Sequence, residues 1–326
     1  MSKRRAALYE WLCGELKRSQ VHLEPASGDA SFRRYFRVYL DGESNSLIAM
    51  DAPPEKEDCQ PFVALAKRLE SQGLHVPAIH AQDLERGFLL LEDLGSIHYL
   101  DALDEKSVDR LYGDALSALI VIQSCVRVEG LPIYDQDMLM GEMGLFREWL
   151  VNRHLGTRLG SEEEEMLDCC FHFLTSNALA QPSVCVLRDF HSRNLMVSTS
   201  PSPGILDFQD AVSGPVTYDL VSLLKDCYIS WPRSRVDDWA RGYFELAVQS
   251  GVLRDDHESK FLNWFHLMGV QRHLKAAGIF ARLFRRDGKP GYLKDIPRTL
   301  GYVTELELDY PELTGLVRLI RRLKLD

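Results

Sequence analysis

The stretch Val184-Cys185-Val186-Leu187-Arg188-Asp189-Phe190-His191-Ser192-Arg193-Asn194-Leu195-Met196-Val197 decides the fold of this chain. An apolar run leads into Asp189, an amide follows at Asn194, and a second apolar run ends in Ile205-Leu206-Asp207. The spacing D-x-x-x-x-N, followed by an aspartate that closes a short strand, is typical of kinase-type phosphoryl transfer. Either half alone is weak, since Asp and Asn are common in turns. Together they are a specific signal.

In such a site one carboxylate accepts the proton of the acceptor hydroxyl, and oxygen ligands hold Mg²⁺ against the phosphates of ATP. The pattern therefore predicts Asp189 as the catalytic base and Asn194 and Asp207 as Mg²⁺ ligands. This sparse set suffices, because Mg²⁺ keeps several waters and phosphate oxygens. Arg188 and Arg193 flank the acid; they could neutralise the transferred phosphate, or pair with Asp210, or serve the structure alone. A metal hydrolase is disfavoured, because no His-rich ligand cluster accompanies the acid.

Composition describes an ordinary globular chain of 326 residues with a net charge of −10. This acidic balance argues against nucleic acid as a partner. No apolar run is long enough for a membrane span, and the N-terminal segment lacks the apolar run of a signal peptide. Seven cysteines without a C-x-x-C pair suggest neither a disulfide framework nor a zinc site. We therefore expect a cytoplasmic protein of one bilobal unit or two domains, with no protein partner evident.

Hydrophobic periodicity predicts strands first and helices afterwards, which indicates an α+β fold. Before the catalytic stretch we expect helices at 3–18 and 58–72 and strands at 21–26, 32–40, 46–50 and 87–91. The later helices are expected at 107–126, 137–155, 161–178, 218–228, 235–250, 256–284 and 312–324. Ser161 is the expected N-cap of the acidic helix start that follows it. We expect a small β-rich N-lobe at 1–95 and a larger helical C-lobe at 96–326.

Two segments of the N-lobe are candidates for binding the nucleotide. The small-residue tip around Ser31 can lay backbone N–H groups over phosphates, although a plain hairpin turn is equally compatible with it. The strand that ends at Glu92 and Leu94 is the expected junction between the lobes, where the backbone could hydrogen-bond an adenine edge. An ordinary strand end is an equal alternative there.

The strings L-R-D-F-H-S-R-N-L-M, I-L-D-F-Q-D-A and P-V-T-Y-D-L resemble the aminoglycoside phosphotransferase and choline kinase superfamily, which shares the protein-kinase fold. The resemblance covers nearly the whole chain. It implies the same roles for Asp189, Asn194 and Asp207, a supporting acid at Asp210, and a loop brace at Asp219.

Narrower strings resemble the bacterial cell-wall-recycling sugar kinases: G-D-A-S-F-R-R-Y-F-R-V, M-D-A-P-P-E, L-L-L-E-D-L-G and Q-R-H-L-K-A-A-G-I-F-A-R-L. This resemblance implies ATP-dependent phosphorylation of N-acetylmuramate and N-acetylglucosamine at the anomeric 1-hydroxyl, in peptidoglycan recycling. The alternatives are another kinase of the superfamily, for an aminoglycoside, choline or homoserine, and a non-catalytic kinase-like binding module.

Two positions depart from the family pattern. Leu187 stands where the superfamily usually has histidine, so the loop needs another brace. Met50 stands near the usual position of the third-strand lysine that holds ATP phosphates, and the 58–72 helix offers no clear glutamate partner. Arg33, Arg34 or Lys56 could supply the phosphate cation instead, and the sequence does not choose among them.

The acceptor sugar is expected to contact the helices at 137–155 and 256–284. The candidates are Glu142 and Trp149 on the first helix and Trp264, His266, Gln271, Arg272, His273 and Lys275 on the second. A sugar that carries a carboxylate would favour Arg or Lys. The alternative for each is a structural role, because Trp is more often buried in the core and Arg more often lies on a solvated helix face.

Overall fold

A computed structural model describes residues 3–27, 32–40, 42, 45–198 and 201–325. The chain separates into two compact units. We call Met1–Ile97 with Leu195–Asp210 the N-lobe, and His98–Asn194 with Ala211–Asp326 the C-lobe. The boundary at residue 95 stays a prediction, and the sequence did not indicate that residues 195–210 belong with the N-lobe. Predicted nucleotide contacts at Ser31 lie outside the described residues.

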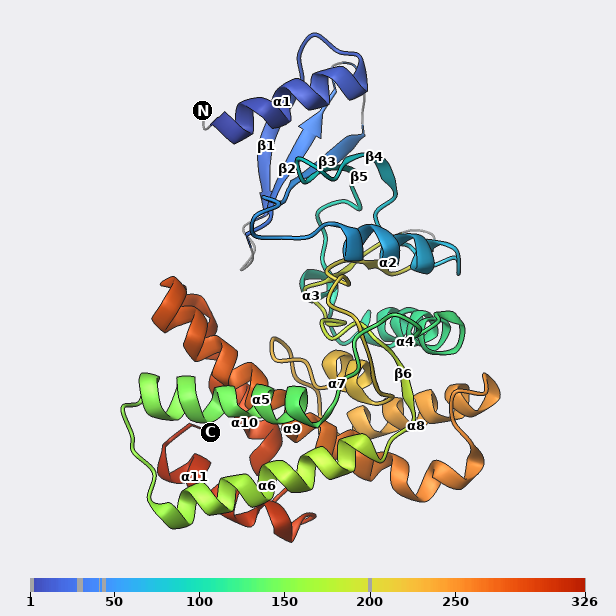
Figure 1. The fold of residues 1–326 in the computed structure, drawn as a ribbon. Coiled ribbons are helices and arrows are strands. Elements are labelled where there is room, and N and C mark those ends of the chain that lie inside the picture. Colours follow the sequence, from blue (N-terminus) through green and yellow to red (C-terminus); the bar gives the residue numbers. More distant parts are fainter. Residues whose placement is uncertain (1–2, 28–31, 41, 43–44, 199–200, 326) are drawn as a thin grey trace. The chain divides into compact units, whose positions relative to one another are not determined.

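The N-lobe is built on a five-stranded antiparallel sheet in the order β1-β2-β3-β5-β4. Its strands are β1 (His22–Ser27), β2 (Arg34–Tyr39), β3 (Ser46–Asp51), β4 (Ile79–Asp83) and β5 (Phe88–Glu92). Helix α1 (Lys3–Leu16) lies over this sheet (Figure 1). Its Leu8 and Leu12 belong to the same apolar cluster as Phe36 and Ala49. Strand β4 was not predicted, because its sequence I-H-A-Q-D offers few apolar or β-branched residues.

The segment 195–210 packs against the N-lobe after the catalytic stretch. Strands β7 (Leu195–Met196) and β8 (Gly204–Ile205) pair with each other, and the Ile205 N–H donates to the carbonyl of His75 at 2.7 Å. Phe208 stacks on Phe62 of α2 (Gln60–Glu70), with ring centroids 4.9 Å apart. These contacts fix the aspartate at the end of β8 on the N-lobe.

The C-lobe is mostly helical, as predicted (Figure 1). Its helices are α3 (Tyr99–Ala102), α4 (Val108–Cys125), α5 (Gln136–Leu145), the π-helix η1 (Phe146–His154), α6 (Ser161–Leu179), α7 (Tyr218–Leu224), α8 (Arg233–Gln249), α9 (Glu258–Asp287), α10 (Ile296–Thr304) and α11 (Thr314–Arg322). Strand β6 (Ser183–Val186) pairs antiparallel with β9 (Val212–Pro215). None of the helices in the described ranges combines the length and apolarity that a membrane crossing requires.

Helix α9 packs against many other elements of the C-lobe. Gly278 allows its backbone to lie close to the backbone at the junction of α5 and η1. A Cβ at Gly278 would lie 2.3 Å from the backbone carbon of Leu145, at the junction of α5 and η1. The predicted helix at 137–155 changes there from α to π winding. Ser161 is the first helical residue rather than the N-cap. The cap is Gly160, whose N–H donates to the Glu163 carboxylate at 3.2 Å.

Candidate active site

The catalytic loop, residues 187–194, follows β6. A buried carboxylate accepts hydrogen bonds from its backbone. Asp219, at the start of α7, accepts the backbone N–H of Leu187 at 2.6 Å and of Arg188 at 2.9 Å. Arg188 has a φ of 74°, a left-handed conformation that is unfavourable for a residue with a side chain. Leu187 stands where the superfamily usually has histidine, and Asp219 supports the loop in its place.

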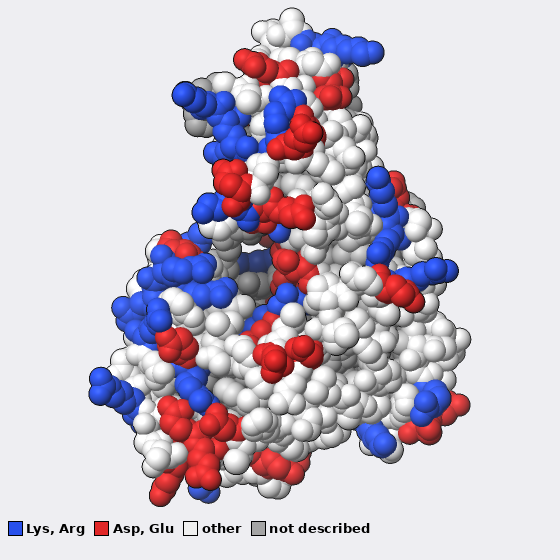
Figure 2. All heavy atoms as spheres, in the orientation of Figure 1, with Lys and Arg blue, Asp and Glu red and all other residues white. Residues whose placement is uncertain are grey.

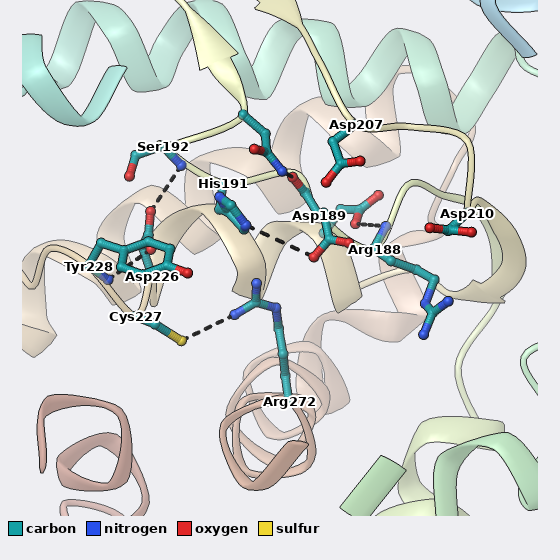
Figure 3. Close-up of polar contacts among 12 residues, drawn as sticks. Arg188, Asp189, His191, Ser192, Asp207, Asp210, Asp226, Cys227, Tyr228 and Arg272 are labelled. Carbon is teal, nitrogen blue, oxygen red and sulfur yellow. Dashed lines mark hydrogen bonds and ion pairs between the residues drawn. The ribbon is translucent and has the colours of Figure 1, made fainter. Parts of the chain in front are cut away.

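A second carboxylate anchors the far side of the loop. Asp226 accepts the N–H of Ser192 at 2.9 Å through one oxygen and that of Tyr228 at 3.0 Å through the other (Figure 3). Sequence reasoning missed Asp226, because a single acid after a helix carries no motif. His191 is buried, with its Nε2 4.0 Å from an Asp189 oxygen, and burial lowers its pKa. The ring is therefore neutral and supports the loop.

The loop orients Asn194 beside Asp189. The Asn194 Nδ2 donates to the backbone carbonyl of Asp189 at 3.1 Å, and its N–H donates to His191 at 2.9 Å. The amide nitrogen of Asn194 therefore points into the loop, and the amide oxygen, its only acceptor, points the other way. On the N-lobe, Gln209 Nε2 donates to Asp207 at 2.7 Å. An amide oxygen and a carboxylate oxygen are each hard ligands of the kind that Mg²⁺ prefers.

On the N-lobe, Arg33 lies beside Asp207 and is held there by Glu57. Its guanidinium is 3.3 Å from a Glu57 oxygen and 3.8 Å from Asp207 Oδ1. Arg34 instead pairs with Asp51, which is fully buried and also accepts from Arg4. Glu57 was not predicted as the carboxylate partner, because it lies just before the helix that was expected at 58–72.

The other expected features of the N-lobe have structural surroundings. Met50 is buried in the sheet, opposite Tyr35 on one strand and Leu89 on the other. Lys56 lies over the Phe32 ring, 5.3 Å from its centroid. The carboxylate of Glu92 accepts the Ala78 N–H at 3.2 Å.

The side chain of Leu94 packs against Gly204, where an added Cβ would approach it to 2.9 Å. Nucleotide contacts by the Glu92 and Leu94 backbone stay predictions.

A pocket of about 430 Å³, its open mouth included, lies entirely within the C-lobe. Its lining comes from the catalytic loop, from residues 218–228 and from one face of α9: Asp189, His191, Tyr218, Cys227, Tyr228, Arg272, Lys275, Ala276, Ile279 and Phe280. Asp189, Arg272 and Lys275 were predicted from the sequence. The aromatic and thiol side chains were missed because no spacing links them to the catalytic stretch.

Residues 22–257 of the chain match the phosphotransferase enzyme family, which is 236 of its 326 residues. The chain belongs to this family. It is 49% identical over 302 residues to a Pseudomonas putida protein named N-acetylmuramate/N-acetylglucosamine kinase, covering 93% of this chain and 88% of that protein.

Solved structures show the same fold. The phosphotransferase resembles the choline kinase LicA from Streptococcus pneumoniae with a TM-score of 0.67 and 14% identity, over 95% of this chain and 100% of that one. It resembles the ADP-bound aminoglycoside phosphotransferase APH(2'')-Ib with a TM-score of 0.60 and 17% identity, over 91% and 97%. The prediction of a protein-kinase-like bilobal fold is confirmed.

Glu142 of the phosphotransferase is the centre of a buried charge cluster rather than part of the pocket lining. Its carboxylate lies 2.9 Å from Lys275 Nζ and also pairs with Arg188, Tyr134 and Gln271. Burial by itself would raise the pKa of Glu142, but Lys275 and Arg188 bring it below its ordinary value. Glu142 therefore positions two cations, one of them on the catalytic loop, and its role as a sugar contact stays a prediction.

His273 is buried and is not among the residues that line the pocket, and its role as a sugar contact stays a prediction. Its ring is fully buried, stacks on Tyr302 with centroids 4.7 Å apart, and bonds to the Lys225 carbonyl at 2.8 Å. Burial lowers its pKa to about 3, so the ring is neutral. One residue further along an α-helix is a rotation of about 100°, which turns His273 away from the face that carries Arg272.

The remaining candidates have mixed positions. Arg193 lies over the Tyr228 ring at 3.7 Å, next to the pocket lining, and stays a predicted substrate contact. Asp210, on the N-lobe, accepts from Gln209 at 3.4 Å, and its predicted role stays untested. Trp264 and His266 are buried in the core. Arg153 lies 4.2 Å over the Trp149 ring.

The brace at Asp219 predicts a specific dependence of stability on pH. Burial raises its pKa from 3.8 to about 7. A carboxyl that holds its proton more tightly when folded contributes most to stability below its unfolded pKa, and the contribution falls as the pH rises from about 4 to about 7. Denaturant unfolding of wild type and Asp219→Asn across this range should therefore show a difference that changes with pH. A constant difference would contradict the prediction, and Asp238→Asn, at an exposed position, is the control.

Proposed function

We propose that the protein is an ATP-dependent sugar kinase that phosphorylates the anomeric 1-hydroxyl of N-acetylmuramate and N-acetylglucosamine in peptidoglycan recycling. One observation carries the proposal: a braced loop presents Asp189 on the wall of a pocket that the C-lobe forms by itself. The high identity to a relative that bears the name of this activity supports the choice of acceptor. ATP and its magnesium complex are abundant in the cytoplasm, where we propose that the protein acts.

In the proposed reaction, the Asp189 carboxylate orients the sugar hydroxyl and accepts its proton. The transition state of phosphoryl transfer is loose, so the base acts mainly by positioning and takes the proton late. Asp219 and Asp226 keep the carboxylate in place through the backbone of its loop. Asp189 has a side chain that is 42% exposed, which leaves it accessible to a ligand in the pocket.

Asn194 and Asp207 would hold Mg²⁺, which when bound neutralises charge on the phosphates. Arg33 is the proposed phosphate-binding cation in place of the usual lysine. Glu57 supports this role because it pairs with the Arg33 guanidinium, as a carboxylate partner supports the cation in related kinases. Ser31 and the backbone of Glu92 and Leu94 are proposed to contact the nucleotide.

Two alternatives receive less support. An aminoglycoside is a polycation and requires an acidic pocket, whereas the charged residues of this lining are two cations, Arg272 and Lys275, and one acid, Asp189. A non-catalytic binding module was suggested by Met50. This alternative has less support, because Arg33 and Glu57 form a cation and carboxylate pair on the same lobe as Met50.

A panel of acceptors with Mg-ATP tests the proposal, with the position of the new phosphate determined by NMR. We expect consumption of ATP with N-acetylmuramate and N-acetylglucosamine and a phosphate on the 1-hydroxyl. Turnover of choline or homoserine, with both sugars inactive, would assign the protein elsewhere in the superfamily. A phosphate on the 6-hydroxyl would overturn the anomeric assignment while leaving the kinase intact.

A further inference from the structure

Arg272 is a buried cation with no carboxylate within ion-pair distance among the described residues, although the carboxylates of Asp189 and Asp226 lie near enough to stabilise its charge and raise its pKa. Its guanidinium is 6% exposed and donates through Nη1 to the Cys227 sulfur at 3.6 Å. Its Nε has no hydrogen-bond partner among the described residues. Burial raises the pKa of the Cys227 thiol, so the sulfur is neutral and supplies no negative charge. Figure 3 shows the side chain rising from α9 toward the catalytic loop.

Lys275, on the same face of α9, differs in having an ion-pair partner, the Glu142 carboxylate that it shares with Arg188. Its ammonium is 2.9 Å from Glu142 and donates to the Tyr218 hydroxyl at 2.9 Å. Of the two cations that line the pocket in the described part of the chain, Arg272 is thus the one without an ion-pair partner. A buried cation without an ion-pair partner is energetically unfavourable. A ligand that brings an anionic group would relieve this cost.

The geometry of the cation suits a carboxylate. A guanidinium presents a planar fork of donors that binds a carboxylate through two parallel hydrogen bonds. Under the proposed function, the two acceptors differ in one chemical group, since N-acetylmuramate carries a lactyl ether with a carboxylate and N-acetylglucosamine does not. Next to Arg272, the apolar side chains of Ala276, Ile279 and Phe280 line the pocket and can accept the methyl group of the lactyl arm.

We infer that Arg272 binds the lactyl carboxylate of N-acetylmuramate and sets the preference between the two sugars. This inference rests on the proposed function and adds a specificity-determining residue to it. Figure 2 shows further Lys and Arg side chains over the C-terminal end of α9, where Arg282, Arg285 and Arg286 lie. Such a surface raises the local concentration of an anionic sugar, but only a buried donor can select it.

The test compares wild type with Arg272→Met and Arg272→Lys in the full chain, at saturating Mg-ATP, with both sugars. A charge-assisted hydrogen bond contributes enough that its loss lowers kcat/KM for N-acetylmuramate by about 10- to 100-fold, mainly through KM. For N-acetylglucosamine we expect a change of less than about threefold. Arg272→Lys keeps the charge without the fork and should lie between. Arg286→Met, at an exposed site of the same helix, is the matched control.

A ligand-side measurement keeps the test independent of folding. With wild-type protein, N-acetylmuramate whose carboxylate is converted to the methyl ester should lose the same factor as Arg272→Met does with the acid. Equal losses for both sugars, confined to kcat, would show that Arg272 acts on Asp189 or on the phosphates, and would overturn the inference. An ester as good as the acid would overturn it too. Wild-type inactivity toward both sugars would instead refute the proposed function.

Discussion

Replacing Asp189 by Asn is expected to lower kcat by about 10²- to 10⁴-fold, because a positioned general base contributes that much to proton transfer. The substitution keeps the size of the side chain and removes the basic oxygen. The carboxylate is 42% exposed and lies 4.0 Å from the His191 Nε2, so the free energy of unfolding should change little. Initial rates with each sugar, and nucleotide affinity by calorimetry, measure the two effects.

The control for Asp189→Asn is Asp238→Asn, an equivalent change on the exposed face of α8. It should retain wild-type turnover. Asp189→Asn with kcat within tenfold of wild type would remove Asp189 from the reaction. Loss of nucleotide binding together with turnover would point to a role in assembling the site rather than in proton transfer.

Glu142→Gln is expected to destabilise the protein by about 3–5 kcal/mol, because removal of one partner leaves buried charges without compensation. Glu142 is 8% exposed and contacts both Lys275 and Arg188. The substitution keeps the hydrogen-bonding shape of the side chain but removes its charge. Denaturant unfolding measures the free energy, and turnover should fall as well because Arg188 lies on the catalytic loop.

Two further variants sharpen the measurement. Glu148→Gln changes an exposed acid of η1 that pairs with Arg153, and surface ion pairs contribute about 0–1 kcal/mol. Adding Lys275→Met to Glu142→Gln removes one of the unpaired cations and should recover part of the lost stability. A Glu142→Gln variant as stable as Glu148→Gln would mean that the cluster does not hold the C-lobe together.

Local patterns account for most of the fold that was predicted correctly. The apolar stripe of α4 and the aromatic and β-branched residues of β2 are properties of short segments, so local patterns detect them. The predictions of secondary structure were wrong where the local sequence pattern was weak or where the conformation depends on contacts with a distant segment. Strand β4 is stabilised by its pairing with β5, and the π-helix η1 occurs where α9 approaches at Gly278.

The predicted catalytic residues behave in the same way. Asp189, Asn194 and Asp207 are recognisable because their spacing along the chain reflects one loop and one strand. Arg33 and Glu57 are separated by 24 residues, and no spacing rule joins them, so their pairing could not be predicted from the sequence. Asp226 was missed for the same reason, because its partner Ser192 lies 34 residues away.

Taken by itself, the sequence determined the fold class and the three residues expected to carry the chemistry, since both are encoded in local order and spacing. Only the tertiary structure decided which side chains of one helix meet the pocket. Arg272, His273 and Lys275 all look suitable for a sugar, yet helix rotation sends His273 into the core and leaves Arg272 and Lys275 on the lining. The structure then separates these two cations, because Glu142 of α5 forms an ion pair with Lys275, whereas the hydrogen bond of Arg272 goes to a neutral thiol and no carboxylate lies within ion-pair distance among the described residues. Such differences depend on contacts between distant segments, which the order of residues does not display.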